Sequence, residues 1–140
     1  MFLFINTSQT DLIDLKLIKD NKIVDTLTSR ENFKQSELLL SLIDKLAGNQ
    51  LKKLTGIVVV KGPGAFSALR FGITTANALA WSLKIPVIGL SVIEAAGDER
   101  ITKSLKLKTK NLTSKKFKPV VPKYGAEPNI TKAKNKKLRK

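Results

Sequence analysis

The sequence predicts an α/β domain with a mixed sheet of about five strands, in the element order β-β-β-α-β-α-β-α, followed by a basic C-terminal tail. Two patterns predict this class: apolar runs of strand length, and apolar residues repeated at three- and four-residue spacing between those runs. The chain has 140 residues, of which 42% are hydrophobic. This length and composition suit one compact domain with its own core.

Three strands are expected to open the domain. Residues 2–6 (FLFIN) form a short apolar run typical of a central strand. Between residues 13 and 17 apolar and charged residues alternate, as in a half-buried strand. Polar residues 19–22 make a turn before KIVDTLT, so residues 11–28 are predicted to form a hairpin.

The first helix is predicted over residues 33–47, where the leucine and isoleucine side chains fall on one helical face. Asn32 and Gln35 stand at the spacing of a capping box. Gly48 occupies the position of a C-terminal cap.

The second half of the domain alternates strands and helices. TGIVVVK and IPVIGL are typical of buried strands, and a helix over residues 65–83 is predicted between them. Ser91 and Glu94 offer a second capping box, which predicts a third helix through Ala96. A three-stranded meander followed by such units is the half-domain plan of ribonuclease-H-like proteins and actin-like (ASKHA) ATPases.

The positive charge is concentrated at the C-terminal end. Residues 1–100 contain 12 Lys/Arg and 10 Asp/Glu, whereas residues 101–140 contain 14 and 1. We therefore expect a domain over residues 1–100 and a largely irregular basic tail over residues 101–140, whose lysines could contact phosphate backbones. Within the tail, residues 101–107 (ITKSLKL) alternate as an edge strand would.

Composition excludes several classes of site. The chain contains no Cys and no His. Disulfides, zinc-thiolate sites, cysteine nucleophiles and Ser-His-Asp triads are therefore absent from these residues. No apolar run has the length of a membrane helix, and residues 1–11 lack the features of a signal peptide, so we expect a cytoplasmic protein that does not contact membranes.

A glycine-rich turn, KGPG, precedes the second helix. Gly62 and Gly64 permit a sharp change of backbone direction, and Pro63 fixes its own φ angle. The helix start that follows could bind an anion, but GPGAFS matches neither the Walker pattern nor the dinucleotide fingerprint. A structural strand-to-helix turn is the favoured interpretation, and a nucleotide cradle is the alternative.

The helix over residues 65–83 carries two stripes and little charge. One stripe is apolar and suits a sheet: Phe66, Leu69, Ile73, Ala76, Ala80 and Leu83. Its neighbour consists mostly of small residues that allow another helix to approach: Ala65, Ala68, Gly72, Thr75 and Leu79. We expect part of this helix to be covered by a partner, with burial under the chain's own first helix as the alternative.

These motifs resemble a known family. NTS after the first strand, the NFKQSELLLSLIDKL helix, and VVVKGPGAFSALRFGITTANALAW followed by IPVIGLSVIEA are similar to bacterial proteins of the TsaB/YeaZ, glycoprotease-like (Gcp-like) family. Where the family usually reads GPGSFTGLRIG, this chain has Ala65, Ser67 and Ala68 in place of Ser, Thr and Gly. The resemblance extends over residues 1 to 97, and family members continue into a second domain of similar fold, so we interpret the sequence as a half-length form.

The resemblance implies an actin-like fold and a non-catalytic scaffold role in making threonylcarbamoyladenosine in tRNAs that read ANN codons. It implies binding to a catalytic TsaD-like subunit through helices 33–47 and 65–83, with a TsaE-like ATPase joining, and a homodimer through the same helices is an open alternative. For such a complex tRNA is the natural target of the basic tail over residues 101–140, and a merely solvated tail is the alternative. Catalytic, cofactor-binding and metal residues are expected to be absent from this chain, with ATP and metal on the partner subunits. The interface residues implied in this way are Phe33, Leu38, Ala65, Ala68, Arg70, Gly72, Thr75, Ala76 and Trp81.

Two observations agree with a non-catalytic role. The metal site of the catalytic paralogue uses a His pair, and this chain contains no His. Actin-like ATPases keep an Asp on the first strand, and this chain has Asn6 there. A neutral amide is a poor replacement for an anionic ligand. The alternatives are a stand-alone nucleotide-dependent or hydrolytic enzyme and, as a lesser one, a basic RNA-binding module.

Overall fold

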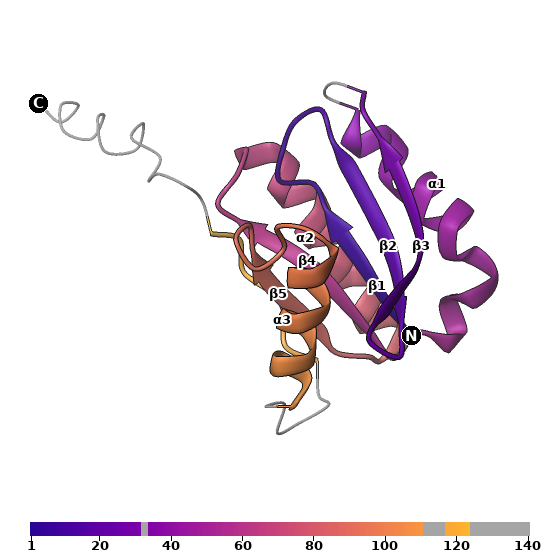
Figure 1. Ribbon diagram of the computed structural model, residues 1–140. Coiled ribbons are helices and arrows are strands. Elements are labelled where there is room, and N and C mark those ends of the chain that lie inside the picture. The colour runs from indigo at the N-terminus through magenta and orange to yellow at the C-terminus, as the bar shows by residue number, and fades with distance from the viewer. Residues whose placement is uncertain (32–33, 111–116, 124–140) are drawn as a thin grey trace, which may run out of the picture.

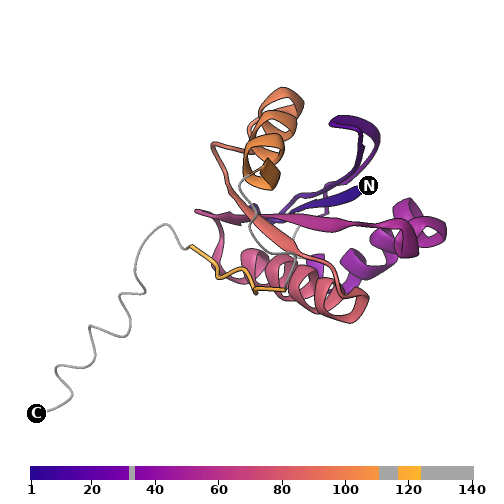
Figure 2. The same ribbon diagram turned by 90° about the horizontal axis from the view of Figure 1, so that it is seen from below.

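Helices cover both faces of one five-stranded sheet in this computed structural model, which describes residues 1–31, 34–110 and 117–123 (Figure 1). Seen edge-on, the sheet separates α1 and α2 on one face from α3 on the other (Figure 2). The strands are β1 (Phe2–Asn6), β2 (Ile13–Lys19), β3 (Lys22–Ser29), β4 (Gly56–Gly62) and β5 (Val87–Ser91). The helices are α1 (Gln35–Ala47), the 3₁₀ helix η1 (Gly48–Lys53), α2 (Phe66–Leu83) and α3 (Asp98–Lys110).

The sheet is mixed, with strand order β3-β2-β1-β4-β5. β1 pairs antiparallel with β2 and parallel with β4, and β5 continues the parallel part. The β2–β3 hairpin closes through Asp20 and Asn21, whose φ angles of 51° and 62° are those a tight two-residue hairpin turn requires. The predicted mixed sheet, its hairpin and the element order are confirmed.

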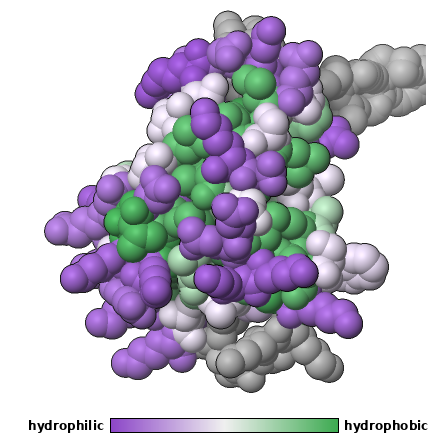
Figure 3. All heavy atoms as spheres, turned by 90° about the vertical axis from the view of Figure 1, so that its right-hand side faces the viewer, coloured by the Kyte–Doolittle hydropathy of each residue, from purple (hydrophilic) through white to green (hydrophobic). Residues whose placement is uncertain are grey.

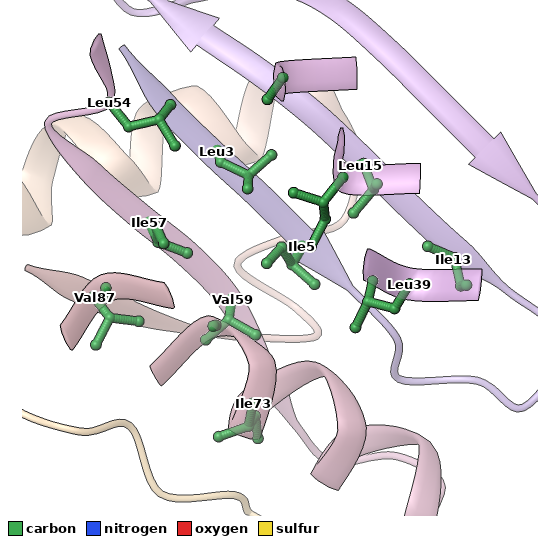
Figure 4. Close-up of a cluster of buried hydrophobic side chains, with 14 of the residues drawn as sticks. Leu3, Ile5, Ile13, Leu15, Leu39, Leu54, Ile57, Val59, Ile73 and Val87 are labelled. Atoms are coloured by element: carbon green, nitrogen blue, oxygen red, sulfur yellow. The ribbon is translucent and has the colours of Figure 1, made fainter. Parts of the chain in front are cut away.

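β1 and β4, in the interior of the sheet, are buried on both faces. Leu3 and Ile5 of β1 point toward α1 and α2, where they pack with Leu39 and Ile73 in the first core (Figure 4). Phe4, the residue between them, points to the opposite face and belongs to a second core. Strands buried in this way cannot be stable unless both faces are covered, because leaving side chains of this size exposed forfeits about 1.5–3 kcal/mol each.

α3 provides the cover for the second face. Its Ile101 and Leu105 are buried in the second core, together with residues of the sheet that include Phe4, Val58 and Ile88. The edge strand predicted over residues 101–107 is therefore wrong, and residues 101–110 are not irregular. The ITKSLKL sequence satisfies both patterns, since Ile101 and Leu105 are four residues apart and lie on one face of a helix. The need to cover the sheet decides in favour of the helix.

The helix predicted through Ala96 is also wrong, although its capping pair forms. Ser91 N–H donates to Glu94 Oε1 at 2.9 Å, and Glu94 N–H donates to Ser91 Oγ at 3.1 Å. These bonds close a turn and not a helix. Gly97 then takes a φ of +99°, a left-handed conformation that favours glycine, and α3 begins at Asp98.

α1 ends at Ala47, as predicted, and begins at Gln35. Asn32 lies outside the described residues, and the N-cap residue is Lys34, which makes no side-chain capping bond. Gly48 is in the right-handed helical region (φ −50°), and the chain continues directly into η1. Gly48 is the C-cap residue of α1, as predicted, but it is not left-handed, because the chain continues as a tighter helix.

Part of the tail is bound to the domain. Residues 117–123, named here the strap, lie beside α2 (Figure 2). The Asn77 side chain donates to the Val120 carbonyl at 3.0 Å and accepts from the Val120 N–H at 2.9 Å. Lys123 N–H donates to the Lys61 carbonyl at 2.7 Å. These bonds place the strap along α2 and the end of β4.

The turn after β5 is held to α3 by charge. Lys108 Nζ lies 3.4 Å from Glu94 Oε1 and donates to the Gly89 carbonyl at 3.1 Å. The hydrogen bond from the Ser91 N–H, followed by the Lys108 ammonium, lowers the pKa of the Glu94 carboxyl below its ordinary value of 4.5.

We expect Asn77→Leu to loosen the strap. Both hydrogen bonds to Val120 are lost, and a neutral hydrogen bond contributes about 0.5–1.5 kcal/mol. Hydrogen exchange at the Val120 and Lys123 amides should accelerate about tenfold or more, as followed by NMR. Asn49→Leu, at an exposed site in η1, is the matched control. Unchanged exchange in Asn77→Leu would contradict this account of the strap.

We expect Glu94 to contribute pH-dependent stability. A carboxyl whose folded pKa is lowered stabilises the fold above its unfolded pKa, and that contribution disappears as the pH falls through the lower, folded pKa. Urea unfolding from pH 7 to pH 3 should therefore show the wild type more stable than Glu94→Gln at neutral pH. The difference should shrink below about pH 4.5. A difference that stays constant over this range would contradict the role of the ionised carboxylate.

Candidate partner interface

The strand-to-helix turn is packed tightly on both sides. Gly62 has a φ of +120° and precedes Pro63 in a cis peptide bond. A side chain at Gly62 would collide with the Lys123 carbonyl of the strap, and one at Gly64 would collide with the Ser8 carbonyl. The backbone N–H of Ala65, the N-cap residue of α2, donates to the same Ser8 carbonyl at 2.9 Å. Ser8 thus fills the space beside Gly64, which favours the structural turn over the phosphate cradle.

Three of the small residues proposed for a partner interface are instead buried within the domain. Thr7 Oγ1 donates to the Ala68 carbonyl at 2.7 Å, and the same hydroxyl lies against Gly72. Ala76 is fully buried. No partner can reach Ala68, Gly72 or Ala76 in this fold, so their assignment to an interface is wrong. Small side chains there allow α2 to approach β1 and the loop after it.

The other proposed residues lie at intermediate positions or on the surface. Leu38 is half-buried against the first core, and Ala65, the N-cap residue of α2, and Thr75, in the middle of that helix, are also half-buried. Phe33 lies outside the described residues. Arg70 and Trp81 are exposed on α2, Trp81 at 69%.

Two phenylalanines join Arg70 and Trp81 on what we name the outward face of α2. Phe66 is 50% and Phe71 43% exposed. The Arg70 guanidinium lies 5.6 Å from the centre of the Phe66 ring, a cation–π geometry. Ser67, Arg70, Phe71 and Thr74 line a shallow hollow of about 360 Å³ on this face. Aromatic residues beside an arginine are the side chains most enriched where proteins bind one another.

Helical periodicity predicts Phe66 on the sheet-facing stripe and does not single out Phe71. Helical phase gives the side of a helix that a residue occupies, but it does not tell whether the sheet extends beneath that turn. Phe66 is the first residue of α2 and is half exposed. Phe71 could have been found, because it stands among Ser67, Arg70 and Thr74, on the side opposite the buried stripe.

The neighbouring helix also exposes apolar surface. Leu40 of α1 is 67% exposed. Figure 3 views the molecule from the side of α1 and β3, where apolar surface shows between hydrophilic side chains. α1 and α2 lie in the same layer under the sheet, so their outer surfaces belong to one side of the molecule (Figure 2).

The end of β1 shows no arrangement for metal chemistry. Asn6 Oδ1 accepts a hydrogen bond from the Ser8 N–H at 2.9 Å. Nearby on β2, the largely buried Lys16 ammonium lies 3.5 Å from Asp14 and 3.2 Å from Asp98, which ties the start of α3 to the sheet. Over residues 1–31, 34–110 and 117–123, no three His, Cys, Asp or Glu residues group as metal ligands would. None of the helices described there is long and apolar enough to span a bilayer.

Known proteins similar to this chain are named for the threonylcarbamoyl modification of tRNA adenosine. Residues 23–105 match the family described as "TsaD: tRNA N6-adenosine threonylcarbamoyltransferase". The chain is 36% identical over 73 residues to the tRNA N6-adenosine threonylcarbamoyltransferase of Geotalea daltonii, which covers 52% of this chain and 21% of that protein. It is 51% identical over 41 residues to the tRNA threonylcarbamoyladenosine biosynthesis protein TsaB of Bacillus subtilis, covering 29% of this chain and 18% of TsaB.

The fold agrees with these similarities. YeaZ from Pseudomonas aeruginosa superimposes with a TM-score of 0.55 and 26% identity over 64% of this chain and 42% of YeaZ. The predicted actin-like α/β class is thereby confirmed. The matched segments span about a fifth of the curated relatives and less than half of YeaZ. The chain belongs to the TsaD family of tRNA threonylcarbamoyladenosine biosynthesis and is a TsaB/YeaZ-like protein within it.

Proposed function

We propose that the chain is a non-catalytic scaffold subunit in the cytoplasmic synthesis of threonylcarbamoyladenosine in tRNA, and that it binds a TsaD-like catalytic subunit through the outward face of α2. The observation that carries this proposal is the exposure of Phe66, Phe71 and Trp81 on the same side of α2 as Arg70, which contacts the Phe66 ring. Large apolar side chains on a helix surface lose contact with water when a partner covers them, which favours association.

The chemistry of the chain supports a scaffold more than a catalyst. These 140 residues contain no His, and the end of β1 offers the neutral Asn6 amide, whose oxygen already accepts a bond from Ser8. The glycine turn before α2 is filled by Ser8 and the strap. On this proposal ATP and metal are bound by the partner subunits, including a TsaE-like ATPase that joins the complex.

The proposed interface differs from the one expected from sequence. The buried Ala68, Gly72 and Ala76 support α2 from within, and the contact to the partner is made by the side chains that project from the opposite side of the helix. The outer surface of α1, with Leu40, extends the same side of the molecule. A homodimer through this surface would compete with the TsaD-like subunit for the same residues.

We expect Phe71→Glu and Trp81→Glu to weaken co-purification with a TsaD-like partner by about tenfold or more, because truncating an interface hot spot costs about 2 kcal/mol or more and a buried unpaired charge adds to that. Ile93→Glu, which introduces the same charge at a similarly exposed site in the turn before α3, is the matched control.

The interpretation depends on the folded state of each variant. All three substitutions are at exposed positions, so circular dichroism spectra and melting temperatures should stay close to those of the wild type. Equal retention of the partner by Phe71→Glu, Trp81→Glu and Ile93→Glu would place the contact elsewhere. Light scattering of the chain alone measures whether the same substitutions dissociate a homodimer into monomers.

We expect the isolated chain to show no ATP hydrolysis or peptidase turnover above a buffer control, while threonylcarbamoyl transfer by a TsaD-like subunit rises when the chain is added. Reaction rates measured for the chain, for the partner and for both together test this. Turnover by the isolated chain that persists after repurification would support the stand-alone enzyme and contradict the scaffold.

A further inference from the structure

α3 presents a set of cations away from the sheet, named here the basic face. Its buried side is fixed by Ile101 and Leu105, which pack into the second core. At 100° per residue, the cations fall within one arc on the opposite side of the helix. All of its members are exposed: Arg100, Lys103, Lys106 and Lys110.

These cations have no carboxylate partner within the part of the chain that the structure describes, whereas other lysines near α3 do. Lys16 is paired with Asp14 and Asp98, and Lys108 is paired with Glu94. Most of the carboxylates near α3 are therefore already paired with these two lysines. Of the two exposed acids in the first turn of α3, Asp98 is paired with Lys16 and Glu99 lies beside four cations, so the basic face carries a net positive charge.

The basic face has a defined length and orientation. Arg100 and Lys110 are ten positions apart, which at the rise of an α-helix corresponds to about 15 Å. It lies on the opposite side of the sheet from the outward face of α2 (Figure 2). A ligand on α3 and a protein on α2 can therefore be bound at the same time.

We propose that the basic face binds the phosphodiester backbone of RNA, and of tRNA in particular, an assignment that rests on the proposed function for its choice of nucleic acid. Lysine and arginine neutralise backbone phosphates without reading bases, so the surface adds affinity and not sequence recognition. The expected tRNA contact thereby moves from an irregular tail to an ordered helix anchored to the sheet.

A membrane is a poorer ligand for this helix. Helices that lie in a lipid surface insert their apolar side into the acyl region. In α3 that side is occupied, because Ile101 and Leu105 are buried in the second core against the sheet, and the exposed large apolar residue of the helix is Leu107. The exposed cations remain available to a ligand that binds without inserting apolar groups, such as a phosphate backbone.

The test compares two double variants of the full chain with the same change in net charge. Lys103→Glu/Lys106→Glu alters the basic face, and Lys52→Glu/Lys53→Glu alters exposed lysines of η1 away from it. Binding of fluorescent tRNA is measured by anisotropy at several salt concentrations. Both variants keep residues 111–140, so any contribution of that segment is equal.

We expect the α3 variant to lose at least about tenfold more affinity than the η1 variant at low salt. Its slope of log K against log salt should fall by about 1.5, as expected for two lost phosphate contacts. Equal losses in both variants would overturn the proposal, since only overall charge would then matter. Tighter, α3-dependent binding to phosphatidylserine vesicles than to tRNA would also overturn it, in favour of a lipid surface.

The same proteins separate this proposal from the scaffold role. Lys103→Glu/Lys106→Glu should still co-purify with a TsaD-like partner, and Phe71→Glu should still bind tRNA. Loss of tRNA binding without loss of the partner would reflect the basic face alone. Failure of Phe71→Glu to affect the partner, with tRNA binding still dependent on α3, would overturn the α2 interface and leave the basic face supported.

Discussion

The burial of β1 and β4 on both faces is the constraint on which the rest of the structure depends. Each strand is paired on both sides, and its successive side chains enter two separate cores. A sheet of this kind needs helices on both faces, since an uncovered face would leave a row of large apolar side chains in water. α1 and α2 cover one face. α3 covers the second face, although its lysine-rich composition would not by itself predict a folded element.

The same constraint explains how α2 is used. Its small residues, among them Ala68 and Gly72, let the helix approach Thr7 and the start of the sheet closely, which leaves them inaccessible. The large residues Phe71 and Trp81 lie on the opposite side of α2 and are in contact with solvent. The molecule thus has an apolar surface on the α2 side and a cationic surface on the α3 side, separated by the sheet.

The glycine turn links these layers to the strap. Gly62 and Gly64 lack side chains where the backbones of the strap and of the loop after β1 come close. Asn77 then imitates a peptide group by pairing with both polar atoms of Val120. A polar residue on the border of the buried stripe is thereby satisfied within the chain, which explains an Asn in an otherwise apolar part of α2.

The sequence by itself determined the strands, the hairpin, the first two helices and the family, because periodicity and the motif around Gly62 are local properties of the chain. It could not decide between helix and strand for residues 101–107, whose pattern fits both, nor show that the Ser91 and Glu94 pair closes only a turn. The sequence also could not show which residues of α2 are buried. Ala68 and Phe71 are neighbours on one helix, and the position of the sheet and of Thr7 makes Ala68 inaccessible and leaves Phe71 exposed. Tertiary packing therefore decided which residues of α2 and α3 remain available to other molecules.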